Sequence, residues 1–195
     1  GLLFLLPPLP SRRRTLALRH LLKEPKFLYI AGLTMLVVMA HFTAYTYVVP
    51  LLQETTHTPQ TLIPTLLLVY GVAGIVGNWV SGKAPWSART ILMLALFGLM
   101  FTYALMLLCG ATAPLVWGIM AVWGIAAAAL NMTPQSYAME LAPHEREAAC
   151  SFSVTGFNAG VGAGALCGGT VLAVAGAYAL PVCGILLALL ALGVL

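Results

Sequence analysis

The chain contains no aspartate, and charged residues of every kind make up only 7% of its 195 residues. Soluble domains carry about 25% charged residues. Hydrophobic residues, in contrast, make up 61% of this chain. A water-soluble fold of this size could not bury so much apolar surface, so the composition predicts a membrane protein.

The patterns of common catalytic and cofactor sites are also missing. The sequence has no phosphate-binding loop, no nucleophile elbow and no cluster of metal ligands. The glycine-rich segment 160–169 follows no strand that would make it a dinucleotide-binding motif. Its four cysteines lie in apolar stretches without metal or redox spacing, and we interpret Cys109, Cys150, Cys167 and Cys183 as packing residues. We therefore predict no enzyme activity, no metal and no cofactor.

The few basic residues that are present fall on one side of the predicted membrane. All nine Lys and Arg residues lie within the first 26 residues, in the 83–89 loop or at Arg146. Because Lys and Arg mark the cytoplasmic side of short loops, this asymmetry predicts the orientation of the chain. The same asymmetry explains the net charge of +4, so we do not expect the protein to bind nucleic acid.

Long apolar stretches predict the fold class. A membrane helix needs about 20 apolar residues, and the backbone groups of a span must be hydrogen-bonded within it. We predict an all-α membrane protein with a bundle of six transmembrane helices over 27–195. The spans are placed at 27–52, 61–82, 90–109, 115–139, 148–174 and from 180 onward. Residues 1–26 are interpreted as the end of a preceding helix and a cytoplasmic linker, so that the chain is a piece of a larger membrane protein.

Polar side chains are concentrated in the first and fourth spans, whereas the third and sixth carry almost none. Polar groups within a membrane usually face the bundle interior or a cavity, so the first and fourth spans are expected to line one. Each candidate also has a structural alternative, a hydrogen bond to a neighbouring helix. For His41 the alternatives are a neutral imidazole that is hydrogen-bonded to a neighbouring helix, or a group that binds a ligand or a proton. The candidate substrate-binding residues are Thr34, His41, Tyr45, Asn131, Gln135 and Asn158.

Glycines recur at every fourth position of the fifth span and, more closely spaced, in the second. Residues four apart share a helix face, and glycine there lets a neighbouring helix approach closely. This spacing predicts helix packing, or a smooth groove that allows sliding during a conformational cycle. The residues concerned are Gly71, Gly74, Gly77, Gly156, Gly160, Gly164 and Gly168.

Five segments are informative when taken together: "LLPPLPS", "MAHFTAYTYVVPLLQ", "GVAGIVGNWVSGK", "LAPHEREAA" and "GFNAGVGAGALCGG". They resemble the C-terminal half of a twelve-helix transporter of the major facilitator superfamily. In detail the chain is similar to bacterial sugar efflux transporters of the drug–proton antiporter branch, and the resemblance covers its whole length. One departure is that Gly82 is followed by "KAPWSAR", where the family often has a Gly-x-x-x-Asp-Arg loop.

The resemblance implies a transporter of the bacterial inner membrane, built from two six-helix bundles that rock around a central site. Its partners would be a small-molecule substrate, protons, the lipid bilayer and an N-terminal six-helix half. No carboxylate lies deep within a predicted span, so a proton-coupling carboxylate is expected in that other half. We expect proton-driven efflux of sugars or similar small polar compounds. The alternatives are a multidrug or nucleoside exporter of the same superfamily, or a membrane binding or signalling protein without transport.

Overall fold

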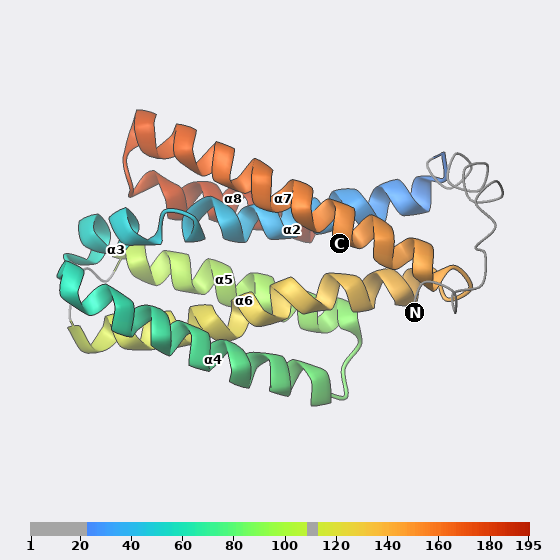
Figure 1. Ribbon diagram of the computed structural model, residues 1–195, viewed down its shortest axis with the longest axis horizontal. Coiled ribbons are helices and arrows are strands. Elements are labelled where there is room, and N and C mark those ends of the chain that lie inside the picture. Colours follow the sequence, from blue (N-terminus) through green and yellow to red (C-terminus); the bar gives the residue numbers. More distant parts are fainter. Residues whose placement is uncertain (1–22, 109–112) are drawn as a thin grey trace, which may run out of the picture.

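The chain folds into helices that run side by side along the long axis of the molecule (Figure 1). The computed structural model describes residues 23–108 and 113–195, so the linker predicted for the first 22 residues lies outside the described part. The elements are α2 (Pro25–Tyr45), α3 (Val48–Thr56), the 3-10 turn η2 (Gln60–Leu62), α4 (Ile63–Lys83), α5 (Ala88–Leu108), α6 (Ala113–Leu141), α7 (Arg146–Ala175) and α8 (Ala179–Val194).

The predicted all-helical membrane fold is confirmed. Within the described residues there is no strand, and five helices (α2, α4 extended by η2, α5, α6 and α7) are long and apolar enough to cross a membrane. The apolar helix α8 corresponds to the predicted sixth span, but at 16 residues it is shorter than the others. Each of the later predicted spans agrees with its helix to within a few residues.

The first predicted span was wrong in extending unbroken to residue 52. Helix α2 ends at Tyr45, and α3 begins three residues later at Val48. The reason lies in Pro50, which has no N–H to donate to the carbonyl of Thr46 and whose ring would clash with it. Tyr47 accordingly leaves the helical conformation, with φ −113° and ψ 32°. The chain therefore bends near the end of α2 that is remote from the basic loops.

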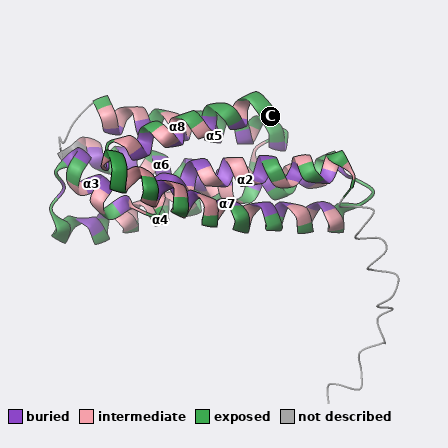
Figure 2. Ribbon diagram, turned by 90° about the horizontal axis from the view of Figure 1, so that it is seen from above, coloured by how far each residue is buried: buried purple, intermediate pink, exposed green. Residues whose placement is uncertain are grey.

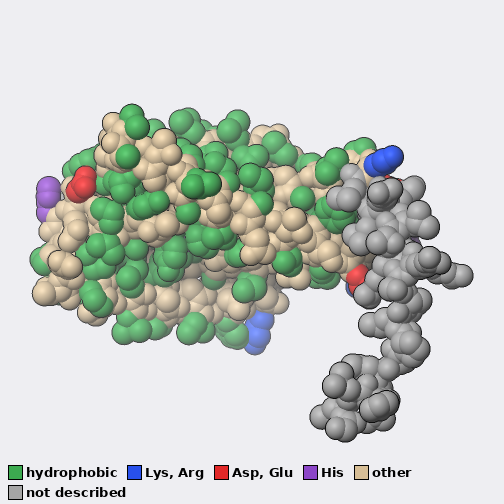
Figure 3. Space-filling view, turned by 45° about the horizontal axis from the view of Figure 1, so that its top comes forward, with side chains coloured by type: hydrophobic (Ala, Val, Ile, Leu, Met, Phe, Trp, Pro, Cys, Tyr) green, Lys and Arg blue, Asp and Glu red, His purple; other side chains and the backbone are tan. Residues whose placement is uncertain are grey.

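Helices α2 and α6 occupy the middle of the bundle, and α4 and α7 expose much of their surface (Figure 2). Large apolar side chains point outward. Ile75, Leu166 and Val174 are 72%, 76% and 83% exposed. Hydrophobic side chains are spread over the whole of the described face seen in Figure 3, on which charged side chains are few and isolated. Such a surface is stable when lipid covers it, which agrees with a multi-pass membrane protein.

The glycines of α7 lie against α2. A Cβ added at Gly160 would be 2.7 Å from the carbonyl oxygen of Met35, and one at Gly164 would be 3.0 Å from the Cβ of Phe42. Gly156 and Gly168 meet backbone oxygens of α2 in the same way. All four glycines are buried. The close approach of α7 to α2 therefore depends on having no side chain at these positions.

The glycines of α4 divide into two groups. A Cβ at Gly77 would be 2.6 Å from the carbonyl oxygen of Ile125 on α6, and one at Gly74 would be 3.4 Å from that of Gly124. Gly71 is exposed, and the position of its absent Cβ faces open space. The packing contact predicted for Gly71 is therefore not present in the described residues, because the backbone of the preceding residue, Tyr70, and not Gly71, lies against Gly124 of α6.

We expect the two ends of the bundle to lie on opposite sides of the membrane. Gln60 lies exposed between α3 and α4, and His144 lies exposed in the loop between α6 and α7 at the other end. On a background in which the native cysteines are replaced by serine, an impermeant maleimide should label Gln60→Cys in intact cells. It should label His144→Cys only after the membrane is opened. Labelling of both positions in intact cells would contradict the topology.

Candidate functional site

A cavity of about 190 Å³ lies between α2, α6 and α7. Most of its surface is apolar, and we call it the polar cavity after the four uncharged polar side chains in its lining. Helix α6 contributes Asn131 and Gln135, which are four residues apart and therefore on one face. Helix α2 contributes Thr34, and α7 contributes Ser153. The remaining wall is formed by Met132, Pro134, Val154 and Phe157. Three helices that are distant in sequence thus bring neutral polar groups together.

The hydrogen bonds around this cavity leave one buried acceptor free. The hydroxyls of Thr34 and Ser153 bond to each other at 3.3 Å across the α2–α7 contact. The Oδ1 atom of Asn131, in contrast, is buried and has no hydrogen-bond partner among the described residues. An unsatisfied buried acceptor costs about 1–3 kcal/mol. A donor from a bound molecule would remove that cost.

The chemistry of the lining favours an uncharged ligand. Amide side chains both donate and accept hydrogen bonds, and hydroxyls do the same. No Asp, Glu, Lys or Arg is among the residues that line this cavity. The arrangement is therefore suited to a small neutral molecule with several hydroxyl groups, packed on one side against the ring of Phe157.

His41 lies outside this cavity, in the interior of the bundle, where it is 1% exposed. The indole N–H of Trp123 donates to its Nδ1 at 3.2 Å. The indole nitrogen can only donate, so Nδ1 must carry the lone pair. The proton of the neutral ring is then on Nε2, which lies 3.3 Å from the hydroxyl of Tyr70. Both ring nitrogens are thus bonded to neighbouring helices, and the geometry fits a neutral imidazole.

Aromatic rings from four helices surround this histidine. Tyr45 stacks on His41 with a centroid distance of 5.1 Å and on Tyr70 with 5.0 Å. The ring of Trp123 stands edge-on to all three, as well as to Tyr103 of α5. The hydroxyl of Tyr103 donates to backbone carbonyls of α2, at 3.1 Å for that of His41. We call His41, Tyr45, Tyr70, Tyr103 and Trp123 the aromatic cluster.

The aromatic cluster is linked to the polar cavity through two phenylalanines. Phe157, which lines the cavity, packs edge-on against Phe42 with centroids 6.3 Å apart. Phe42 in turn packs edge-on against Tyr45, with centroids 5.9 Å apart. A change in the packing of the cluster would therefore reach the cavity wall through direct ring contacts.

The structure brings together some of the predicted site residues and separates others. Thr34, Asn131 and Gln135 line one cavity. His41 and Tyr45 belong to the aromatic cluster. Asn158 lies on the exposed side of α7, and its amide nitrogen donates to the carbonyl of Val154 in its own helix at 2.8 Å. The first and fourth predicted spans both contribute to the cavity, whereas α5 and α8 contribute nothing to its lining.

Sequence reasoning missed Ser153 and the partners of His41. Ser153 lies three residues before Gly156, so extending the glycine face of α7 by one turn would have found it. Tyr70 and Trp123 gave no comparable signal. Both lie in apolar stretches, where an aromatic residue is as readily explained by lipid contact or by the core. Their pairing with His41 depends on which faces of α4 and α6 turn toward α2.

The described fold is that of a multi-pass helical membrane protein with an uncharged cavity between α2, α6 and α7. The chain belongs to the Major Facilitator Superfamily, which residues 2–165 match. This confirms the family that the sequence segments resemble, and it makes the chain part of a transporter family rather than an enzyme.

Relatives in the same family carry more specific names. Proteins named "Probable sugar efflux transporter" from Haemophilus influenzae strains PittGG and ATCC 51907 / DSM 11121 / KW20 / Rd are each 33% identical to the chain over 167 residues. The counterpart from strain 86-028NP is 32% identical. Each alignment covers 84% of this chain and 42% of the relative. The chain therefore spans less than half the length of these curated relatives.

Proposed function

We propose that the chain forms one half of a secondary transporter that exports sugars or similar small polar compounds by alternating access. The polar cavity would supply one side of the substrate site, with Thr34, Asn131, Gln135 and Ser153 in contact with the substrate. The names of the relatives support efflux of a sugar. The uncharged lining, with two amide and two hydroxyl side chains, supports a hydroxylated, uncharged ligand.

The observation that carries this proposal is the buried, unpaired Oδ1 of Asn131, a residue that lines the cavity. Within the protein, buried acceptors are almost always paired. A sugar hydroxyl can donate to Oδ1 and at the same time accept from a neighbouring amide or hydroxyl. We propose indirect roles for His41 and Tyr45, which would hold the cavity wall through Phe42. Asn158 would contact the substrate only from the exposed face of α7.

We further propose that transport is coupled to protons and that the coupling carboxylate is supplied by an N-terminal six-helix half. The five glutamates of the described residues all lie near helix ends or in loops: Glu24, Glu54, Glu140, Glu145 and Glu147. The neutral tautomer at His41 leaves no second protonation site without breaking the Trp123 bond. The proposed location is the bacterial inner membrane, with the end that carries Lys83, Arg89 and Arg146 facing the cytoplasm.

Replacing Asn131 with alanine is expected to weaken substrate affinity by about fivefold to tenfold, because one hydrogen bond to an uncharged group contributes about 1 kcal/mol. The measurement is counterflow in vesicles that contain the whole transporter, with panels of sugars, nucleosides and cationic drugs. Thr170→Val is a matched control, because that hydroxyl is exposed on α7 and bonds only to Leu166 of its own helix.

The same assay decides between substrates. Counterflow of sugars alone would support the proposed class, whereas counterflow of nucleosides or drugs alone would move the protein to another branch of the superfamily. If Asn131→Ala and Thr170→Val transport the substrate with the same affinity, Asn131 is not in the site. Absence of counterflow with every panel, from folded protein, would favour a binding role without transport.

A further inference from the structure

Two cysteines from different helices lie against each other in the fold. The Sγ atoms of Cys167 on α7 and Cys183 on α8 are 3.7 Å apart. The S–S bond of a disulfide is about 2.05 Å long, so the two sulfurs are in contact as thiols. Their separation of 16 residues in the sequence gave no sign of this pair, because the contact depends on how α7 packs beside α8.

The backbone of α2 fixes the positions of both cysteines. Each cysteine directly precedes a buried glycine that packs on α2. The absent Cβ of Gly168 on α7 faces the carbonyl oxygen of Thr43. A Cβ added at Gly184 on α8 would be 3.1 Å from the carbonyl oxygen of Ala40. Ala40 and Thr43 are neighbours on one face of α2, so α7 and α8 approach α2 at the same level.

The pair lies toward the end of the bundle that contains the turn between α7 and α8. Cys183 is four residues from Ala179, the first residue of α8, or about 6 Å along the helix axis. Both cysteines are partly exposed. The loops that carry the basic residues are at the other end, so the proposed orientation places the pair in the outer half of the membrane. Disulfides form and persist on that side of a cell membrane.

The remaining cysteine of the described residues cannot take part in this contact. Cys150 is 17 residues before Cys167 on the same helix, which is about 25 Å along the helix axis. It therefore lies near the opposite end of α7 and serves as an internal control.

We propose that Cys167 and Cys183 form a redox pair that an external disulfide oxidises to a cross-link between α7 and α8. The thiolate of one cysteine attacks a sulfur of the external disulfide, and the first thiolate leaves. The thiolate of the other cysteine then attacks the sulfur of its partner in this mixed disulfide, and the second thiolate leaves. In total the two cysteine thiols lose two protons and two electrons and gain one S–S bond, and the external disulfide is reduced to two thiols.

The cross-link would fasten α8 to the helix whose glycines lie on α2. At 16 residues α8 is shorter than the five helices that are long enough to cross a membrane. A disulfide stabilises a fold mainly by restricting the unfolded chain. The redox pair involves neither the polar cavity nor the aromatic cluster, and it holds whether or not the proposed sugar transport is correct.

Disulfide mapping of the purified whole transporter tests this proposal. The folded protein is incubated with oxidised glutathione, its remaining thiols are blocked in denaturant, and it is cleaved with chymotrypsin, which cuts after Tyr178 between the two cysteines. The peptides of Cys167 and Cys183 are expected to be linked until dithiothreitol is added, whereas Cys150 should be recovered as a blocked thiol. Oxidation should also raise the thermal midpoint by about 5 °C.

Single substitutions identify the sulfurs that are responsible. Cys183→Ser should remove both the linked peptides and the rise in the thermal midpoint. Cys150→Ser should retain both, because that thiol is remote from the pair.

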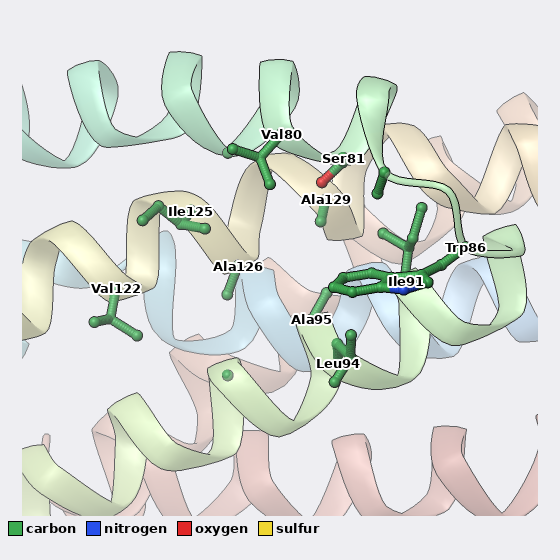
Figure 4. Close-up of a pocket in the computed structure, with 13 residues that line it drawn as sticks. Val80, Ser81, Trp86, Ile91, Leu94, Ala95, Val122, Ile125, Ala126 and Ala129 are labelled. Carbon is green, nitrogen blue, oxygen red and sulfur yellow. The ribbon is translucent and has the colours of Figure 1, made fainter.

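A second cysteine pair controls for chance encounters within the bundle. Val80 of α4 and Leu94 of α5 lie on opposite sides of an apolar recess (Figure 4) and are 46% and 50% exposed. In a variant whose native cysteines are replaced by serine, Val80→Cys together with Leu94→Cys should give no cross-link under the same conditions. Absence of linked peptides from the folded wild type, or an equal yield from this control pair, would overturn the proposal. Linked peptides without a rise in the thermal midpoint would overturn the stabilising role of the cross-link.

Discussion

Leucine at Gly160 is expected to prevent the bundle from forming, whereas leucine at Gly162 is expected to be tolerated. At Gly160 the first added carbon alone would lie 2.7 Å from the carbonyl oxygen of Met35 and 2.9 Å from the Cβ of Val38. The three further carbons of leucine could be accommodated only if α7 moved away from α2. Even modest overpacking costs about 1–3 kcal/mol, and separating these helices would cost more.

Gly162 is a matched control in the same helix. It is exposed, and nothing lies within 4 Å of the position that its Cβ would occupy. The measurement is the yield of monodisperse protein in detergent and its thermal midpoint, which report folding independently of transport. If both leucine variants reach the wild-type yield and midpoint, the contact between α7 and α2 does not require glycine.

Alanine at Trp123 is expected to lower the thermal midpoint by about 10 °C, because truncating a buried tryptophan costs about 3–5 kcal/mol. This side chain is fully buried and touches four rings of the aromatic cluster. Phenylalanine at the same position should have a smaller effect. It retains most of the packing but leaves Nδ1 of His41 without its donor, a loss of about 1–3 kcal/mol.

Trp117→Ala provides the comparison for this series, since Trp117 lies in the same helix but is 37% exposed. Its loss should change the midpoint by much less than the loss of Trp123. Equal effects of Trp123→Ala and Trp117→Ala would mean that the aromatic cluster does not stabilise the bundle. A Trp123→Phe variant as stable as the wild type would show that the bond to His41 contributes nothing.

Features that depend on one segment could be predicted from the sequence. The spans follow from apolar runs, and the buried face of α7 follows from glycines at every fourth position, because both patterns are local. Gly71 shows the limit of that argument. Spacing placed it with Gly74 and Gly77, but the residue of each α4 turn that meets α6 depends on the crossing of the two helices, and in this turn that residue is Tyr70.

The candidate site was harder to predict because it is formed between helices. The sequence identified Thr34, Asn131 and Gln135 as polar groups that require an interior position, and the structure gathers them into one cavity. The sequence could not separate His41 from these three residues. A buried polar side chain is expected both in a ligand site and in a hydrogen bond between helices. Only the positions of Trp123 and Tyr70 reveal that both imidazole nitrogens are already bonded.

The four glycines of α7 also require a fixed number of residues between them, and not only a particular residue type. Successive residues of an α-helix are rotated by about 100°, so one residue inserted between Gly156 and Gly160 would turn every later glycine away from α2. Side chains from the preceding positions, such as Ala163 and Cys167, would then meet the backbone of α2 instead. Insertions and deletions within 156–168 should therefore be far more damaging than substitutions on the exposed face of the same helix.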